Sequence, residues 1–150
     1  MRISIGNDHR GVDMKRRIVQ QLELLGHDVT DRGATTENSV DYPDIALAVG
    51  HDVAGGKADR GILICGTGIG MAVAANKVPG VRAATCQDTQ TARLSRQHND
   101  LNVLCLAGSL DDATTDQVVS VWLTTDFEGG RHGRRVQKIR DAECQDHESA

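Results

Sequence analysis

The stretch GILICGTGIGMA, from Gly61 to Ala72, joins an aliphatic run, a glycine-rich loop and a run of small residues. The aliphatic run predicts a buried strand, and the small residues predict a closely packed helix after the loop. Glycines let the backbone approach a ligand closely and direct consecutive N–H groups at it. The positive end of the following helix faces the same point. The junction therefore predicts a cradle for an anion.

Cys65 lies where the predicted strand meets this loop. A helix N-terminus favours the thiolate form of cysteine, and a thiolate beside an anion cradle suits chemistry that develops negative charge on a bound oxygen. Two alternatives remain open, namely a buried inert thiol and a tight turn that binds nothing. The loop lacks the Lys of a P-loop and the early position of a dinucleotide fingerprint.

Short apolar runs alternate with longer amphipathic runs along the chain, which predicts a parallel sheet covered by helices on both faces. The predicted strands are Arg2–Gly6, His27–Asp31, Arg60–Cys65, Val81–Cys86 and Asn102–Leu106. The predicted helices are Gly11–Leu25, Tyr42–Ala54, Ile69–Lys77, Thr89–His98, Ala113–Thr124 and Arg131–Glu143. We expect one domain over residues 1–150, with a frayed polar tail from Gln145 to Ala150.

The composition limits the classes of partner. The chain carries 17 Lys and Arg against 21 Asp and Glu, a net charge of −4, which gives no reason to expect nucleic acid or a membrane surface. No apolar run is long enough for a transmembrane helix or a secretory signal. The four cysteines lack the close spacing of zinc or redox motifs. We therefore expect reduced thiols and a cytoplasmic location.

Polar residues follow the ends of several predicted strands, and parallel sheets bind ligands at their carboxyl ends. Asp8 and His9 follow the first strand, Tyr42 opens the helix after the second, residues 65–70 follow the third, and residues 86–88 follow the fourth. Asp8 and His9 could bind sugar hydroxyls and move protons, or they could form only a turn with a helix N-cap. The convergence predicts a site at this edge of the sheet.

Two further groups lie in the C-terminal half. His98 and Asn99 end a predicted helix, where an imidazole could do chemistry or only complement the helix dipole. Arg131 and Arg135 are four residues apart, so they share a helix face and could hold one phosphate. No acidic residue at a neighbouring turn pairs with them, which favours an anion site over a solvated basic face.

The sequence resembles the type B ribose-5-phosphate isomerases, within the wider family of galactose- and allose-phosphate isomerases. The matching motifs are Asp8-His9, Asp41-Tyr42-Pro43, residues 61–70, Ala75-Asn76-Lys77, residues 94–100 and residues 128–132. They follow one another in order and cover about residues 1–143. The resemblance implies a three-layer α/β/α sandwich around a Rossmann-like five-stranded parallel sheet. It also implies a homodimer or tetramer whose active sites are shared between subunits.

The resemblance further implies aldose–ketose isomerisation of a phosphorylated sugar through a cis-enediol, without metal or cofactor. Cys65 would be the base that moves a proton between C1 and C2, and Thr67 would help to move protons at the sugar oxygens. His98 with Asp8 would open the furanose ring. The implied substrate-binding residues are Gly66, Gly68, Ile69 and Gly70 at the enediolate, Tyr42 and Asn99 at the sugar, and His9, Arg131 and Arg135 at the phosphate.

One position departs from the family pattern. Many members carry a phosphate-binding Arg after the fifth strand, and an ungapped reading places Ser109 there, followed by Asp111 and Asp112. A hydroxyl offers one weak donor where a guanidinium offers a charged fork. This predicts a preference for a sugar phosphate other than ribose 5-phosphate, with four-, five- and six-carbon substrates all open.

Two other classes of function are compatible with the sequence. One is a non-catalytic sugar-phosphate-binding protein on the same scaffold, which the presence of Cys65, Thr67 and His98 disfavours. The other is a hydrolase or transferase that uses the same thiol as a nucleophile and would form a covalent intermediate with its substrate.

Overall fold

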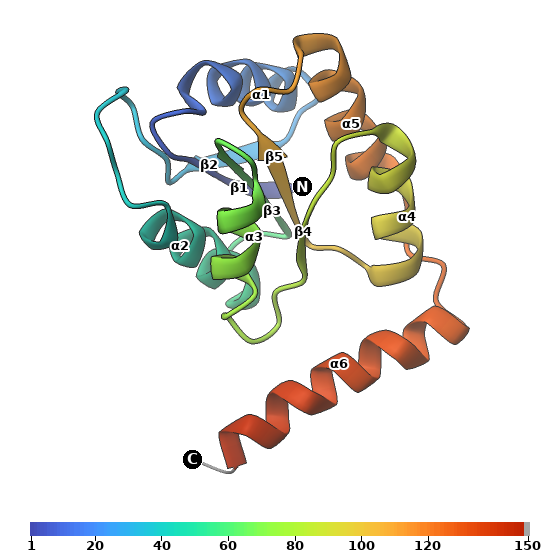
Figure 1. The fold of residues 1–150 in the computed structure, drawn as a ribbon. Coiled ribbons are helices and arrows are strands. Elements are labelled where there is room, and N and C mark those ends of the chain that lie inside the picture. Colours follow the sequence, from blue (N-terminus) through green and yellow to red (C-terminus); the bar gives the residue numbers. More distant parts are fainter. Residues whose placement is uncertain (149–150) are drawn as a thin grey trace.

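The structure, a computed structural model, describes residues 1–148 and contains a five-stranded parallel sheet in the order β2-β1-β3-β5-β4 (Figure 1). The strands are β1 (Arg2–Asn7), β2 (Asp28–Asp31), β3 (Arg60–Cys65), β4 (Ala83–Thr85) and β5 (Val103–Ala107). The central strands β1, β3 and β5 are almost wholly buried. Their aliphatic sequences suit strands that are covered on both faces.

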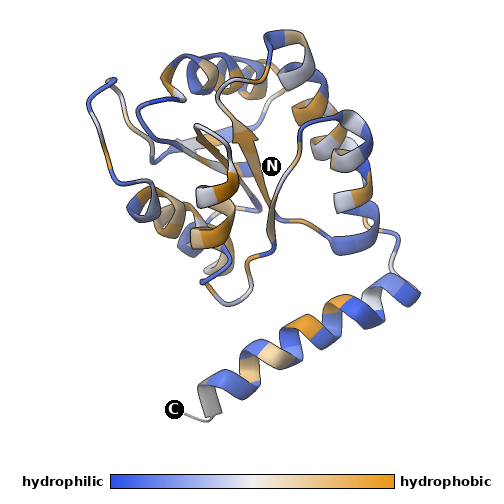
Figure 2. Ribbon diagram, viewed as in Figure 1, coloured by the Kyte–Doolittle hydropathy of each residue, from blue (hydrophilic) through white to orange (hydrophobic). Residues whose placement is uncertain are grey.

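Helices cover both faces of the sheet. The helices are α1 (Val12–Leu24), α2 (Tyr42–Ala54), α3 (Ile69–Ala75), α4 (Thr89–Asn99), α5 (Asp112–Thr124) and α6 (Arg131–Glu148). Helices α1, α4 and α5 pack on one face, and α2 and α3 pack together on the other (Figure 1). The predicted three-layer α/β/α sandwich is confirmed. Figure 2 shows apolar residues concentrated on the sheet and the inner sides of these helices.

Side chains of β3 alternate between the two faces, as strand geometry requires. Ile64 belongs to the cluster that contains Trp122, whereas Leu63 and Cys65 belong to the cluster that contains Met71. Cys65 is therefore directed to the face covered by α2 and α3. The pleat of β3 thus determines which helices surround the thiol.

Two element boundaries differ from the prediction at the turn between α3 and β4. Helix α3 ends at Ala75 rather than Lys77, and β4 begins at Ala83 rather than Val81. The side chain of Asn76 explains both differences. It donates to the carbonyl oxygen of Ala83 and accepts from the N–H of Ala83, each at 2.8 Å. The amide side chain of Asn76 thus pairs with the backbone of Ala83 as a neighbouring strand would, and this fixes where the loop ends.

Helix α6 leaves the body of the molecule and packs mainly against α4 (Figure 1). A frayed tail was expected from Gln145, but the helix continues to Glu148, because no Gly or Pro interrupts the sequence after Gly133. Residues 149–150 lie outside the described part. Within residues 1–148, no helix combines the length and the apolar character needed to cross a bilayer.

Candidate active site

A pocket of about 390 Å³ lies where β1 and β3 end, which is large enough for a small phosphorylated ligand. It is lined by Asp8, Arg10, Tyr42, Cys65, Gly66, Thr67, Ile69 and Gly70. All of these except Arg10 are residues that the sequence analysis placed in the site. The parallel strands bring them together because β1 and β3 pair in register and end at the same edge of the sheet.

Loop amides hold the two candidate proton-transfer groups. The Sγ atom of Cys65 accepts a hydrogen bond from the N–H of Gly68 at 3.2 Å, and the side chain is buried. The Oγ1 atom of Thr67 accepts from the N–H of Ile69 at 3.2 Å. The two N–H groups thus orient the reactive side chains.

The amides left for a bound oxyanion include those of Gly66, Thr67 and Gly70. Their N–H groups have no hydrogen-bond acceptor within residues 1–148, whereas those of Gly68 and Ile69 are occupied by the thiol and the threonine hydroxyl. Gly68 has a φ of +79°, and a Cβ atom there would lie 2.9 Å from Thr85. Glycine is therefore required at this position on two grounds, conformation and space.

Two side chains flank the loop. A Cβ atom at Gly70 would lie 2.8 Å from the ring of Tyr42, and one at Gly66 would lie 3.1 Å from the side chain of Arg10. Tyr42 is the first residue of α2, and its ring covers the first turn of α3. Both glycines therefore allow a close approach, one to an aromatic wall and one to a cation.

Asp8 is buried and forms a turn rather than a helix cap. Its Oδ1 atom accepts a hydrogen bond from the N–H of Arg10 at 2.9 Å, which is an Asx turn. The N-cap of α1 is Gly11, which has no side-chain cap. The N-cap alternative for Asp8 is therefore wrong, and its second carboxylate oxygen has no hydrogen-bond partner in the described chain.

His9 lines a second pocket beside the first. Its Nδ1 atom accepts from the N–H of Val40 at 3.4 Å, so in the neutral ring the hydrogen is on Nε2. This pocket also contains Arg10, Glu37, Gly108 and other residues. Arg10 is the residue common to the two pockets.

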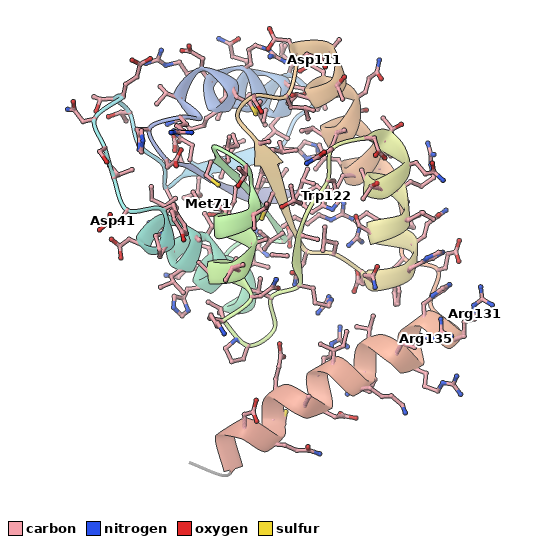
Figure 3. The ribbon with its side chains drawn as sticks, viewed as in Figure 1. Asp41, Met71, Asp111, Trp122, Arg131 and Arg135 are labelled. Carbon is pink, nitrogen blue, oxygen red and sulfur yellow. The ribbon has the colours of Figure 1, made fainter. Side chains whose placement is uncertain are left out.

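Four predicted site residues lie elsewhere in the chain. Helix α4 ends with His98 and Asn99, just before β5 begins, whereas Cys65 pairs with the last residue of β5. The four residue steps of this strand correspond to about 13 Å. Arg131 and Arg135 lie at the start of α6, far from α3 (Figure 3). One chain therefore does not bring these four residues to the thiol.

A ring stack orients His98, and the sequence analysis missed its partner. The rings of His98 and His132 are stacked with centroids 4.2 Å apart and an interplanar angle of 9°. Burial lowers the pKa of His132, and the charges of His98 and Arg131 act in the same direction. This keeps His132 neutral and able to stack. In the sequence, the only indication of a role for His132 was its place in the motif of residues 128–132.

Glu128 lies near the same stack, with its carboxylate 3.5 Å from Nε2 of His132. Ligand atoms of His98, Glu128 and His132 lie within 4.8 Å of one another. A metal ion lies close to the plane of each imidazole that binds it, and two nearly parallel stacked planes share no such point. The rings would have to rotate before they could hold one ion.

Comparison with known proteins shows the family of the chain. Residues 3–139 match the family described as Ribose/Galactose Isomerase. Ribose-5-phosphate isomerase B of Escherichia coli K12 is 45% identical over 139 residues, which cover 92% of this chain and 93% of that protein. D-erythrulose-4-phosphate isomerase of Pectobacterium atrosepticum is 42% identical over 140 residues, which cover 91% of each chain.

A solved structure agrees with these matches. The ribose-5-phosphate isomerase B of Clostridium thermocellum has a TM-score of 0.94 and 47% identity, and the match covers 97% of this chain and 99% of that one. The chain belongs to the ribose/galactose isomerase family. The resemblance drawn from the motifs is thereby confirmed.

Proposed function

We propose that this chain is an aldose–ketose isomerase of a phosphorylated sugar, with Cys65 as the base. The observation that carries the proposal is the thiol itself, which accepts an amide N–H in a pocket shared with Thr67, Asp8 and free loop amides. The family and its named relatives, which are isomerases of sugar phosphates, support this activity.

The reaction follows from the positions of these groups. The Cys65 thiolate removes the proton from C2 of the aldose, and the electron pair forms the C1–C2 double bond of an enediolate. The amides of Gly66 and Gly70 stabilise the charge that develops on oxygen. Thr67 helps to move the proton between O1 and O2, and the thiol returns its proton to C1 to give the ketose. No atom is gained or lost.

The remaining roles require a second subunit. His98, with Asp8, would open the sugar ring, Asn99 would line the sugar, and Arg131 with Arg135 would hold the phosphate. Because one chain keeps the first of these about 13 Å or more from Cys65, a two-fold dimer with shared sites supplies the missing residues. We include this dimer in the proposal.

A non-catalytic binding protein and a thiol-dependent hydrolase are the competing functions. A binding protein would hold sugar phosphates without converting them. A hydrolase would accumulate a covalent intermediate on the thiol and show a burst of product. An isomerase shows neither behaviour, since its thiol only takes and returns a proton.

Replacing Arg131 and Arg135 together with Ala is expected to weaken binding of phosphorylated sugars. Both side chains are exposed and form no ion pair with any described residue, which leaves them available to an anion. Loss of charge-assisted hydrogen bonds should raise KM about 10- to 100-fold, with some fall in kcat because remote binding energy positions the carbons. Steady-state kinetics would measure both values.

Arg140→Ala is the matched control, because Arg140 is an exposed cation on the opposite face of α6 from Arg131. It should leave KM and kcat unchanged. If the double variant behaves like this control, Arg131 and Arg135 are surface charges.

Ser109 is expected to mark an altered substrate preference. Its hydroxyl is exposed in the loop after β5, where many members of the family carry a cation. A panel of four-, five- and six-carbon sugar phosphates should give poor activity on ribose 5-phosphate relative to another member. The similarity to a D-erythrulose-4-phosphate isomerase makes the four-carbon substrates the first to assay. The inference fails if ribose 5-phosphate is the best substrate and Ser109→Arg does not improve its binding.

A further inference from the structure

Arg10 has a position that the proposed chemistry leaves unexplained. It lies directly after Asp8 and His9 and lines both the pocket of Cys65 and the neighbouring pocket of His9. Its Cδ and Nη1 atoms would each lie 3.1 Å from a Cβ atom at Gly66, so the side chain passes over the oxyanion loop. A guanidinium group is thus placed within the candidate active site, on the same chain as the thiol.

The charge of Arg10 is not neutralised by the protein. Its side chain is exposed and forms no ion pair with any residue of the described chain. Arg17, the other arginine at these pockets, is paired with Asp112 and Asp116. The neighbouring loop offers Ser109 and no cation. Arg10 is therefore the unpaired arginine that these two pockets offer to an anionic ligand.

We propose that Arg10 binds the phosphate of a four-carbon sugar phosphate and so sets the preferred chain length. The proposal rests on the proposed isomerase function. Since Arg10 shares a pocket with Cys65, an anion bound to it lies close to the carbons that exchange the proton. A shorter carbon chain places its phosphate nearer to those carbons. A longer chain carries the phosphate past Arg10, toward Arg131 and Arg135 of a second subunit.

The backbone around Arg10 favours such a role. Its own N–H is held by the carboxylate of Asp8, and its carbonyl oxygen lies 2.9 Å from where a Cβ atom at Gly108 would stand. The turn therefore fixes the Cα position, while the exposed side chain remains free to meet the ligand. A guanidinium fork suits the bidentate recognition of phosphate.

The test compares wild type, Arg10→Ala and Arg16→Ala on a four-carbon ketose 4-phosphate and on ribose 5-phosphate. Arg16 is an exposed arginine on α1 whose partner is Asp13, so its loss removes the same charge outside the site. We expect Arg10→Ala to raise KM for the four-carbon substrate about 10- to 100-fold, and for the five-carbon substrate less than about threefold. Arg16→Ala should change neither value.

Three results would overturn the proposal. Equal loss of kcat on both substrates would show that Arg10 stabilises the enediolate instead. Equal rises in KM would show no selection of chain length. Kinetics like those of Arg16→Ala would show no contact with substrate. Thermal melting of each variant checks that it is folded. Arg10→Lys should restore part of the affinity, because lysine returns the positive charge but cannot form the paired hydrogen bonds of a guanidinium group.

A second measurement separates this proposal from the isomerase function. If wild type converts no phosphorylated sugar, the proposed function fails, and inorganic phosphate then serves as the probe. Phosphate should slow alkylation of Cys65 in wild type, and Arg10→Ala should need at least about tenfold more phosphate for the same protection. Equal protection in both proteins would overturn the role of Arg10 as a phosphate ligand.

Discussion

Cys65→Ala is expected to lower kcat by about 10²- to 10⁴-fold, while KM for the sugar phosphate stays nearly constant. The side chain takes and returns the proton but contributes little to binding, which depends on the loop amides and the phosphate contacts. The variant should therefore still bind substrate. Loss of exchange between the substrate C–H group and deuterated solvent would show that proton transfer is the step removed.

Cys144→Ala is the control, since Cys144 is an exposed thiol on α6. It should retain wild-type kinetics. Near-wild-type turnover in a pure Cys65→Ala preparation would rule out Cys65 as the base. Substrate should also protect Cys65 from alkylation, measured in the Cys144→Ala background so that the exposed thiol does not react. Burial raises the pKa of the thiols of Cys86 and Cys105, which disfavours their reaction.

Mixed dimers of Cys65→Ala and His98→Ala subunits are expected to recover activity that neither variant has alone. In a hybrid dimer, one site combines an intact thiol from one subunit with an intact imidazole from the other. Equal mixing with random exchange gives hybrids in about half of the dimers and one working site in each. Activity should therefore return to about a quarter of the wild-type value.

Thr67→Ala provides the matched control for this mixing. Thr67 and Cys65 belong to the same loop, so a hybrid of their variants has no site with both residues intact. That mixture should show no activity beyond that of its Thr67→Ala subunits alone. Hybrids shown by native mass spectrometry to form, yet inactive in the first mixture, would contradict a shared site. So would a fully active monomer at the concentration of the assay.

The sequence predicted every strand and helix because short apolar runs alternate with longer amphipathic runs along the chain. The aliphatic strand and the glycine loop of residues 61–70 also predicted the position of the thiol correctly. The boundaries around β4 were wrong, because the side chain of Asn76 replaces backbone pairing there. An Asn in a turn gives no sign in the sequence that its side chain will pair with a strand backbone.

The residues that sequence reasoning missed depend on tertiary packing. Arg10 follows the Asp8-His9 motif, and only the pairing of β1 with β3 places it over Gly66. His132 becomes notable only because α6 docks on α4 and stacks it on His98. A cation or an imidazole in a polar segment carries no sign of its spatial neighbours.

The projection of α6 from the molecule has a consequence for hydrogen exchange. Its 18 residues extend for about 27 Å and touch the rest of the chain at few points, among them a hydrogen bond of 3.0 Å from the N–H of Gly80 to Glu143. Few tertiary contacts protect its backbone, whereas β3 is almost wholly buried, so its amides should exchange faster than those of β3. Arg131 and Arg135 belong to the first turns of this helix, so their positions depend on it. In the proposed shared site, a second subunit that covers α6 would therefore slow this exchange and strengthen phosphate binding at a distance from the reacting carbons.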